Sequence, residues 1–398
     1  MEQVVASQDG WNMQIIVPMS GFGERFRRVG FTVPKPLIPI QGKPIISHVI
    51  DLFPGEENLI FVCNLEHLSS ENYSMEKTIK SYCPTATVVG ITPHRLGPVH
   101  AVLQVKNLVD REKPVIVNYC DFSCYWDWNK FKNFAKNSGA DGIIPAYKDF
   151  HPHSLGDTNY AYLKLEKGWV SDIQEKKPFT KNKINEFASS GTYYFKSGSM
   201  MIDSMEKAVK TKLSVNGEFY LSLAYKPILA QKKKIACYPL QHFFQWGTPE
   251  DVFEFNYWSE TFKNLTLSTE KNKPLLLGDL VIPVGGLGQR FKNEGYKKPK
   301  PLIEVSGLPM VLQAMNDLNN SNKKLVVIRS DMEKTKDLEI SIKAKFKDTI
   351  ITKIDHVTDG QAITANIGIK ALESKFGNSN LPLTIAACDG GLIYEKDR

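Results

Sequence analysis

The sequence predicts an α/β protein with a doubly wound, mostly parallel sheet of the Rossmann-like kind, present in two copies of which the second is incomplete. Two observations support this fold class. Short apolar stretches alternate with helix-like stretches along the chain, which is the order typical of βαβ units. A glycine-rich loop also follows the first apolar stretch directly, and this opening segment recurs in the second half of the chain.

The expected elements follow the same order in both halves. In the first half, a strand at residues 14–17 leads into the glycine loop, a helix is expected at 44–53, and a second strand at 59–62. In the second half, residues 280–282 precede the loop and residues 324–328 form the next strand. Strands that alternate with helices in this way indicate a mostly parallel sheet.

The internal repeat relates residues 16–44 to residues 281–309 without a gap. Most of the shared residues are glycine, proline, arginine and lysine, the types that set backbone shape and bind phosphate. Chance would scatter matches over all residue types. The positions shared by both copies, numbered in the first, are Pro18, Gly21, Gly23, Arg25, Phe26, Gly30, Pro34, Lys35, Pro36, Leu37, Ile38, Gly42 and Pro44.

The repeat predicts a first domain at residues 12–262, a linker at 263–277 and a partial second domain at 278–398. The linker is predicted because residues 263–273 are polar and loop-like. The second copy has only about 120 residues, about half the length of the first. It is therefore either a reduced domain or the opening part of a longer one.

Composition excludes several classes of protein. Hydrophobic residues make up 42% and charged residues 23% of the chain, which is typical of a globular protein. No signal peptide and no uncharged apolar run long enough to span a bilayer is present, so we expect a cytoplasmic protein without a membrane partner. The six cysteines lack paired spacing and are expected to be reduced thiols.

The net charge of +7 comes from dispersed lysines with a few short runs. No aromatic residues interleave with these runs as a nucleic-acid platform would require, so we expect no nucleic-acid partner. A mild positive charge would suit a phosphorylated substrate.

The loop after the first strand contains Ser20, Gly21 and Gly23, followed by Arg25. Glycines at these places allow backbone amides to approach a phosphate chain closely. Ten residues further, Lys35 lies between two prolines that restrict the backbone. Arg25 and Lys35 are therefore expected to converge on the phosphates of a nucleotide and to stabilise charge that develops during phosphoryl or nucleotidyl transfer.

Other phosphate-binding motifs fit this loop poorly. A dinucleotide-binding GxGxxG loop would need a third glycine where Phe26 stands, and it has no use for the Pro-Lys-Pro element. The GxxxxGK[ST] pattern of P-loop proteins is not present in the sequence.

The GxGxR pattern followed by PKP resembles the opening signature of the sugar-phosphate nucleotidyltransferase family, the pyrophosphorylases that make nucleotide sugars. The resemblance extends in order from residue 16 to about residue 262. It implies that the glycine loop and Arg25 bind a triphosphate and that Lys35 also contacts phosphate. It further implies that Gly97 and Pro98 read the base, with Gly360 as the counterpart in the second copy.

The resemblance also implies roles for residues later in the chain. Asp121, at the end of an apolar strand, would bind Mg²⁺, as expected for a carboxylate at the carboxyl end of a parallel strand. Glu175 would meet the acceptor and Lys176 its phosphate, with Lys177 as a neighbouring alternative for the lysine. Gly191 would line the acceptor pocket. One element departs from the pattern, since Gln245 stands where the family usually has a second metal-binding aspartate.

The sequence therefore predicts an enzyme of the nucleotidyltransferase class that couples a nucleoside triphosphate to a sugar 1-phosphate or similar small phosphate, with Mg²⁺ as cofactor and release of pyrophosphate. CTP, UTP and dTTP are expected nucleotides, activated precursors of surface polysaccharide are expected products, and a homo-oligomer is possible. The alternatives are a nucleotide-sugar-dependent glycosyltransferase, although no DxD triad follows Asp121, and a non-catalytic nucleotide-binding or scaffold protein.

The second copy retains the equivalent positions of the predicted phosphate site. Weak nucleotide binding or a structural role is expected for it. The retained residues are Gly286, Gly288, Arg290, Lys300, Gly360 and Asp389.

Overall fold

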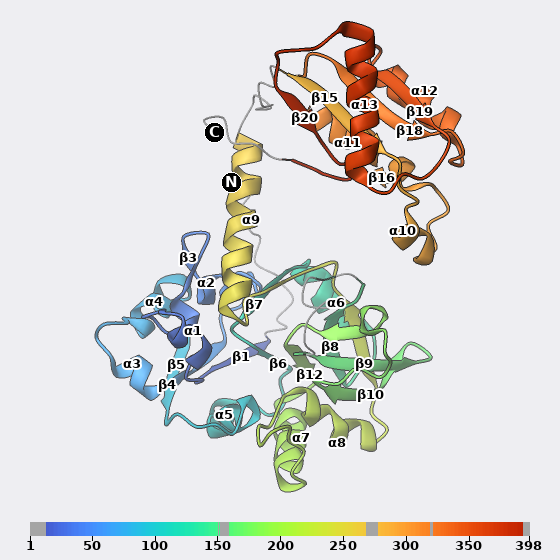
Figure 1. Ribbon diagram of the computed structural model, residues 1–398. Coiled ribbons are helices and arrows are strands. Elements are labelled where there is room, and N and C mark those ends of the chain that lie inside the picture. The colour runs from blue at the N-terminus through green and yellow to red at the C-terminus, as the bar shows by residue number, and fades with distance from the viewer. Residues whose placement is uncertain (1–12, 150, 152–158, 268–277, 319–320, 393–398) are drawn as a thin grey trace. The chain divides into compact units, whose positions relative to one another are not determined.

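The computed structural model describes residues 13–149, 151, 159–267, 278–318 and 321–392. The chain forms two compact units, Met1–Lys263 (unit 1) and Asn264–Arg398 (unit 2) (Figure 1). Helix α9, Pro249–Leu267, continues into the segment predicted as a loop-like linker, so the first residues of that segment are helical. Residues 268–277 lie outside the described part. Among the described residues, no helix combines the length and the apolar character needed to cross a membrane.

Unit 1 is built on one ten-stranded sheet in the order β11-β9-β10-β13-β8-β12-β6-β1-β4-β5. The predicted α/β fold class is confirmed, and the four strands β6-β1-β4-β5 are parallel as expected. The rest of the sheet is mixed, because β12 runs antiparallel to both β6 and β8 and because β9, β10 and β11 pair antiparallel. The expectation of a mostly parallel sheet thus holds only for the amino-terminal half. The strands are β1 Gln14–Met19, β4 Leu59–Asn64, β5 Thr87–Ile91, β6 Val115–Asn118, β8 Gly142–Tyr147, β9 Ala161–Glu166, β10 Trp169–Glu175, β11 Phe187–Ser189, β12 Thr192–Phe195 and β13 Ile235–Pro239.

Helices cover both faces of the unit 1 sheet. Because side chains of a strand alternate between faces, Ile15 and Val17 of β1 enter one core and Ile16 enters the other. Helices α2, α4 and α6 contribute to the first core, and α5, α7 and α8 to the second. The helices of unit 1 are α1 Glu24–Arg28, α2 Ile45–Ile50, α3 Leu65–Ser69, α4 Met75–Tyr82, α5 Pro98–Gln104, α6 Trp128–Asn137, α7 Gly198–Lys210, α8 Tyr225–Ala230 and α9.

Two small two-stranded sheets of unit 1 lie outside the large sheet. Strands β2 (Pro39–Ile40) and β3 (Lys43–Pro44) form one, and β7 (Phe122–Tyr125) and β14 (His242–Gln245) form the other. The second small sheet joins segments that are far apart in the sequence. Its pairing of Gln245 with Phe122 brings the end of β14 beside Asp121.

Unit 2 contains a four-stranded parallel sheet in the order β19-β18-β15-β20 (Figure 1). This is the order of β5-β4-β1-β6 in unit 1, and the register is also the same, since Ile15 pairs with Leu59 and the repeat-equivalent Leu280 pairs with Lys324. Helices α11 and α12 pack on one face and α13 on the other. The elements are β15 Asp279–Val284, α10 Gln289–Asn293, β16 Glu304–Val305, β17 Leu308–Pro309, α11 Met310–Asp317, β18 Lys324–Arg329, α12 Thr335–Lys345, β19 Ile350–Ile354, α13 Gln361–Phe376 and β20 Leu383–Ile385.

Candidate active site

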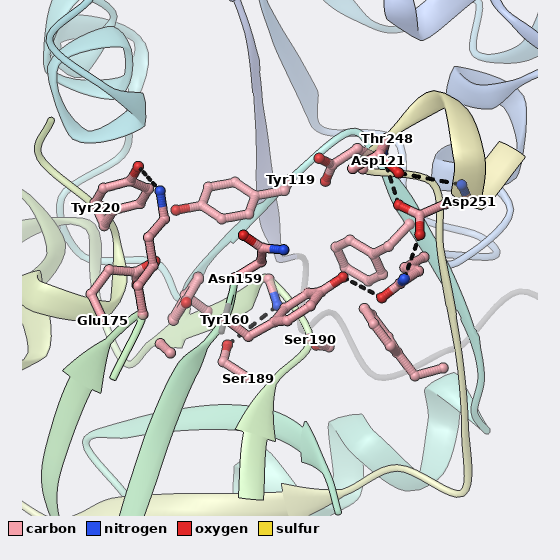
Figure 2. Close-up of a pocket in the computed structure, with 18 of the residues that line it drawn as sticks. Tyr119, Asp121, Asn159, Tyr160, Glu175, Ser189, Ser190, Tyr220, Thr248 and Asp251 are labelled. Carbon is pink, nitrogen blue, oxygen red and sulfur yellow. Dashed lines mark hydrogen bonds between the residues drawn. The ribbon is translucent and has the colours of Figure 1, made fainter. Parts of the chain in front are cut away.

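Two adjoining cavities open at the carboxyl ends of the parallel strands of unit 1. One, of about 670 Å³, is lined by the glycine loop and by the start of α5, and we call it the loop cavity. The other, of about 400 Å³, lies over the mixed half of the sheet, and we call it the sheet cavity (Figure 2). The two cavities have a common wall, formed by Arg25, Tyr119, Asp121, Tyr220 and Gly247. Groups bound on either side of this wall would lie next to one another.

The glycine loop begins where β1 ends, and Ser20, Gly21 and Gly23 all line the loop cavity as predicted. Gly23 has φ 66° and ψ 28°, a left-handed conformation that glycine adopts without strain. This conformation starts the short helix α1, which carries Arg25 to the wall between the cavities.

Lys35 and Asp121 form the centre of the site. The Lys35 Nζ atom donates a hydrogen bond to Asp121 Oδ2 at 2.8 Å and another to the carbonyl oxygen of Gly247 at 3.1 Å. Lys35 is held in a short 3₁₀ turn after Pro34, and its ammonium lies 5.2 Å from the centre of the Phe26 ring. Arg25 and Lys35, which were predicted to converge on phosphates, both line the loop cavity, and their catalytic roles stay predictions.

Gly97 and Pro98 line the far side of the loop cavity at the start of α5. Gly97 has φ 88°, and a Cβ atom there would lie 2.8 Å from both the backbone nitrogen and the carbonyl oxygen of Phe219. Only glycine fits this contact. His94 also lines the cavity, whereas His100 packs against the His94 ring with ring centres 4.8 Å apart.

Glu175, labelled in Figure 2, is the last residue of β10, and Lys176 follows it; both line the sheet cavity. The Lys176 Nζ atom donates to the Tyr220 hydroxyl at 2.6 Å, and Lys176 itself has a positive φ of 55°, a strained conformation for lysine. Glu175 accepts a hydrogen bond from the Ser222 hydroxyl at 2.5 Å. Burial raises the pKa of Glu175 from 4.5 to about 7, although the Ser222 hydrogen bond and Lys176 oppose the increase.

Gly191 lies between β11 and β12 on the floor of the sheet cavity. Its φ is 101°, and a Cβ atom would lie 3.0 Å from the rings of both Tyr119 and Phe122. Ser189 lines the cavity beside it and accepts a hydrogen bond from the Gly191 backbone nitrogen at 3.2 Å. The predicted acceptor segment is therefore in the sheet cavity.

Gln245 is engaged on both sides of its amide group. Its Oε1 atom accepts a hydrogen bond from the Tyr160 hydroxyl, and its Nε2 atom donates to Asp251 Oδ1, each at 2.5 Å. Asp251 Oδ2 accepts from the Thr248 backbone nitrogen at 2.7 Å (Figure 2). The Oε1 atom thus keeps one lone pair beside its bond with Tyr160, and no metal role is assigned to Gln245.

Comparison with known proteins decides the family. The family model described as nucleotidyl transferase matches residues 15–260, more than half of the chain. The chain belongs to this family. The match coincides with unit 1 and contains both cavities and every site residue predicted there.

Curated relatives of this nucleotidyl transferase are distant in sequence. A bifunctional protein GlmU of Methanococcus vannielii is 25% identical over 275 residues, which are 69% of this chain and 61% of the relative. Mannose-1-phosphate guanyltransferase beta-B of Xenopus laevis is 24% identical over 245 residues, 60% of this chain and 62% of the relative. The chain thus spans about three fifths of the length of these relatives.

Solved structures show the same fold. A nucleoside-diphosphate-sugar pyrophosphorylase from Vibrio cholerae RC9 superimposes with a TM-score of 0.51 at 17% identity, covering 61% of this chain and 100% of that chain. A UDP-glucose pyrophosphorylase complexed with UDP-glucose gives a TM-score of 0.50 at 20% identity, covering 63% of this chain and 99% of that chain. At these identities the likeness concerns the fold alone.

Sequence reasoning missed several residues that line the cavities of this nucleotidyl transferase. Tyr160 and Tyr220 come from loops that carry no recognisable motif. Asp251 belongs to a Thr-x-x-Asp pattern that signals a helix start, and Thr248 and Asp251 do form reciprocal hydrogen bonds before α9. Its carboxylate nonetheless faces the sheet cavity, so the capping pattern was the only available signal.

The predicted residues of unit 2 occupy equivalent places in its smaller sheet. Gly286 and Gly288 lie in the loop after β15, and Arg290 lies in α10. The Lys300 Nζ atom donates to Asp389 Oδ2 at 2.5 Å. Gly360 precedes α13, as Gly97 precedes α5 in unit 1.

Proposed function

We propose that unit 1 transfers a nucleotidyl group from a nucleoside triphosphate to a sugar 1-phosphate or similar small phosphate, with release of pyrophosphate. The observation that carries the proposal is the common wall of the two cavities. Lys35 and Asp121 meet at this wall, the glycine loop lies on one side of it and Lys176 on the other. A triphosphate in the loop cavity would then present its α-phosphate to an acceptor in the sheet cavity.

The reaction requires one bond to form and one to break. An oxygen of the acceptor phosphate attacks the α-phosphorus, the bond to the bridging oxygen between the α- and β-phosphorus breaks, and pyrophosphate leaves with the electron pair. Arg25 and Lys35 stabilise the negative charge on the triphosphate, and Lys176 orients the attacking phosphate. No covalent bond to the protein is needed in this scheme.

The residues present fit a magnesium ion only in part. In the described part of the chain, no three His, Cys, Asp or Glu side chains are grouped so that they could hold a metal ion. Asp121 has a side chain that is 35% exposed at the wall, and one carboxylate together with substrate phosphates is a usual set of ligands for Mg²⁺. Bound there, the ion would neutralise charge on the phosphates.

The sheet cavity has the chemistry of a sugar site. Ser189 and Tyr160, which carry hydroxyl groups, Asn159 with its amide and Glu175 with its carboxyl group line it. These groups can exchange hydrogen bonds with several sugar hydroxyls while Lys176 meets the phosphate. The names of the relatives point to guanylyl transfer to mannose 1-phosphate and to a UDP-sugar, so GTP is added to CTP, UTP and dTTP as a proposed nucleotide.

The test is pyrophosphate release by the full chain with Mg²⁺, each of ATP, GTP, CTP, UTP and dTTP, and a panel of sugar 1-phosphates. Release that depends on one nucleotide and one acceptor, and that is lost in Lys35→Ala, is the expected result. Lys77→Ala is the matched control, because Lys77 is an exposed lysine of α4 that lines neither cavity. Binding of nucleotide without release, over the whole panel, would favour a non-catalytic nucleotide-binding protein.

A further inference from the structure

Unit 2 lies outside the part of the chain that the family model matches, yet it carries a lysine–aspartate pair of the same geometry. Lys300 Nζ lies 2.5 Å from Asp389 Oδ2, compared with 2.8 Å between Lys35 and Asp121. The ammonium of Lys300 lies 5.6 Å from the centre of the Phe291 ring, compared with 5.2 Å for Lys35 and Phe26. Both lysines therefore leave their loop in the same direction.

The glycine loop of unit 2 also has the backbone shape of the first. Gly288 has φ 63° and ψ 30°, within a few degrees of Gly23. A Cβ atom at Gly288 would lie 3.1 Å from Lys300 Cβ, so the loop and the lysine are packed against each other. Arg290 follows Gly288 at the same distance along the chain as Arg25 follows Gly23.

At one pair of equivalent positions, the smaller and the larger side chain are exchanged between the units. Unit 1 has Ser20 in the loop and Ala101 in α5, whereas unit 2 has Gly285 in the loop and Thr364 in α13. A Cβ atom at Gly285 would lie 2.9 Å from the Thr364 hydroxyl oxygen, so the larger threonine occupies the space that a loop side chain would need. The loop of unit 2 is thus closely packed on α13 at Gly285.

The Lys300–Asp389 pair has little value for stability alone. Its side chains are 26% and 40% exposed, and ion pairs that solvent reaches contribute little to folding. A cation and a carboxylate side by side at the carboxyl ends of parallel strands are instead the groups that meet a phosphate chain and its metal ion.

From these observations we infer that unit 2 holds a second binding site for the magnesium complex of a nucleoside polyphosphate. The loop of Gly286 and Gly288 faces the phosphates, Arg290 and Lys300 neutralise their charge, and Asp389 is the carboxylate for the ion. The inference concerns binding and not turnover. It does not rest on the activity proposed for unit 1.

The base side of the second site differs from that of the first. Ahead of the helix, unit 1 has His94, Arg95 and Leu96, whereas unit 2 has Val357, Thr358 and Asp359. The cationic Arg95 and the apolar Leu96 are thus replaced by the hydroxyl of Thr358 and the carboxylate of Asp359, while the apolar Val357 stands in the place of His94. The two units are therefore expected to prefer different bases.

The decisive measurement is the number of nucleotide equivalents bound by the full chain, by equilibrium dialysis with Mg²⁺ and each of ATP, GTP, CTP, UTP and dTTP. Variants Lys300→Ala and Arg290→Ala are compared with the wild type and with Lys345→Ala. Lys345 is the matched control because it is also a lysine of unit 2 near a phenylalanine ring, at 6.0 Å from Phe346, but it precedes β19 at the opposite end of the sheet. Circular dichroism shows whether each variant is folded.

The expected result is a loss of one equivalent in Lys300→Ala and Arg290→Ala, or at least a tenfold weaker Kd for that equivalent, with no change in Lys345→Ala. Lys35→Ala in the same dialysis experiment distinguishes a failure of the unit 1 proposal. If unit 1 binds no nucleotide, Lys35→Ala leaves the number of bound equivalents unchanged, and Lys300→Ala removes the single equivalent that the wild type binds. Folded Lys300→Ala and Arg290→Ala proteins that bind as much nucleotide as the wild type would overturn the inference.

Discussion

The parallel strands β5-β4-β1-β6 of unit 1 and β19-β18-β15-β20 of unit 2 share their order, the register of the central pair, a glycine loop and a lysine–aspartate pair. They differ in what lies beside the loop. In unit 1, Gly97 is packed against Phe219, and the next residue, Tyr220, accepts a hydrogen bond from Lys176 in the sheet cavity. In unit 2, a Cβ atom at Gly360 would meet no atom within 4 Å.

This difference separates local from long-range requirements. The phosphate loop is made by about 20 contiguous residues and one aspartate, so the same segment can form it in either unit. The acceptor side of unit 1 needs segments around residues 160, 175, 190 and 220 to meet, and its mixed half-sheet provides that meeting. Substitutions at equivalent positions can show whether this separation is also one of function.

The largest effect is expected from the two aspartates. Asp121→Asn removes the carboxylate that would hold Mg²⁺ at the wall of the two cavities and is expected to lower kcat by about 10²–10³-fold, a loss similar to that of one group that stabilises charge in a transition state. Asp389→Asn is expected to act on nucleotide binding by unit 2 instead. Steady-state pyrophosphate release measures the first and equilibrium dialysis the second.

Asp203→Asn is the control for this comparison, because Asp203 is an exposed aspartate of α7 whose side chain is 65% exposed. An equal loss of turnover in Asp389→Asn, with Asp121→Asn unimpaired, would contradict the assignment of the chemistry to unit 1.

A smaller effect is expected from Lys176→Ala, which removes the lysine of the acceptor side. We expect kcat/KM for the acceptor to fall by about 10²-fold because the attacking phosphate is no longer oriented. Nucleotide binding should change less, since Lys176 lines only the sheet cavity.

The neighbouring exposed Lys177 offers the matched control. A loss in Lys177→Ala that equals or exceeds the loss in Lys176→Ala would show that the wrong lysine has been assigned. Initial rates at varied acceptor concentration distinguish the two variants.

The two glycines before α5 and α13 should respond differently to alanine. Gly97→Ala forces a side chain onto the Phe219 backbone in a left-handed conformation and should destabilise unit 1 by about 2–3 kcal/mol. Gly360→Ala meets no neighbour and should cost about 1 kcal/mol in unit 2.

Because all six tryptophans precede residue 264, tryptophan fluorescence follows the unfolding of unit 1 alone. Gly97→Ala is expected to lower the midpoint of that transition and Gly360→Ala to leave it in place. Equal shifts of the midpoint in the two variants would contradict the expected difference between Gly97, which is packed against Phe219, and Gly360, which meets no neighbour.

The sequence allowed the local half of this architecture to be predicted, for a physical reason. Residues such as Gly23, Arg25 and Lys35 are close in sequence, and the type and spacing of these residues limit what the backbone can do. The expected strands at 14–17, 59–62, 280–282 and 324–328 are all present. Asp121 was predicted from the family resemblance, which places an aspartate at the end of this apolar strand, although β6 ends at Asn118 and the aspartate lies in the loop after it.

The remainder depends on contacts that no local pattern reports. The antiparallel direction of β9, β10, β11 and β12 was missed because the pairing partners of these strands are set by the tertiary fold and not by spacing. Tyr160 and Asp251 approach Gln245 only through such contacts. The helical start of the predicted linker was missed because its polar sequence has no hydrophobic periodicity that would distinguish a helix from a loop.

The smallest expected effect concerns pH and again contrasts the two units. The pKa of Glu175 is about 7 in the folded protein, against an ordinary value of 4.5, mainly because of burial. Between these values the folded protein binds more protons than the unfolded chain, so the contribution of Glu175 to stability is full below about pH 4.5 and is lost as the pH rises through 7. In unit 2 the pKa of Glu304 is lowered instead, chiefly by its hydrogen bond with Lys298, so its contribution is lost as the pH falls.

Glu175→Gln should therefore flatten the decline in the tryptophan-monitored midpoint between pH 5 and pH 8, whereas Glu304→Gln should not change it. If the midpoint declines with pH in Glu175→Gln as it does in the wild type, the pKa of Glu175 is not raised. Glu175 would then be a charged carboxylate beside the acceptor hydroxyls at neutral pH.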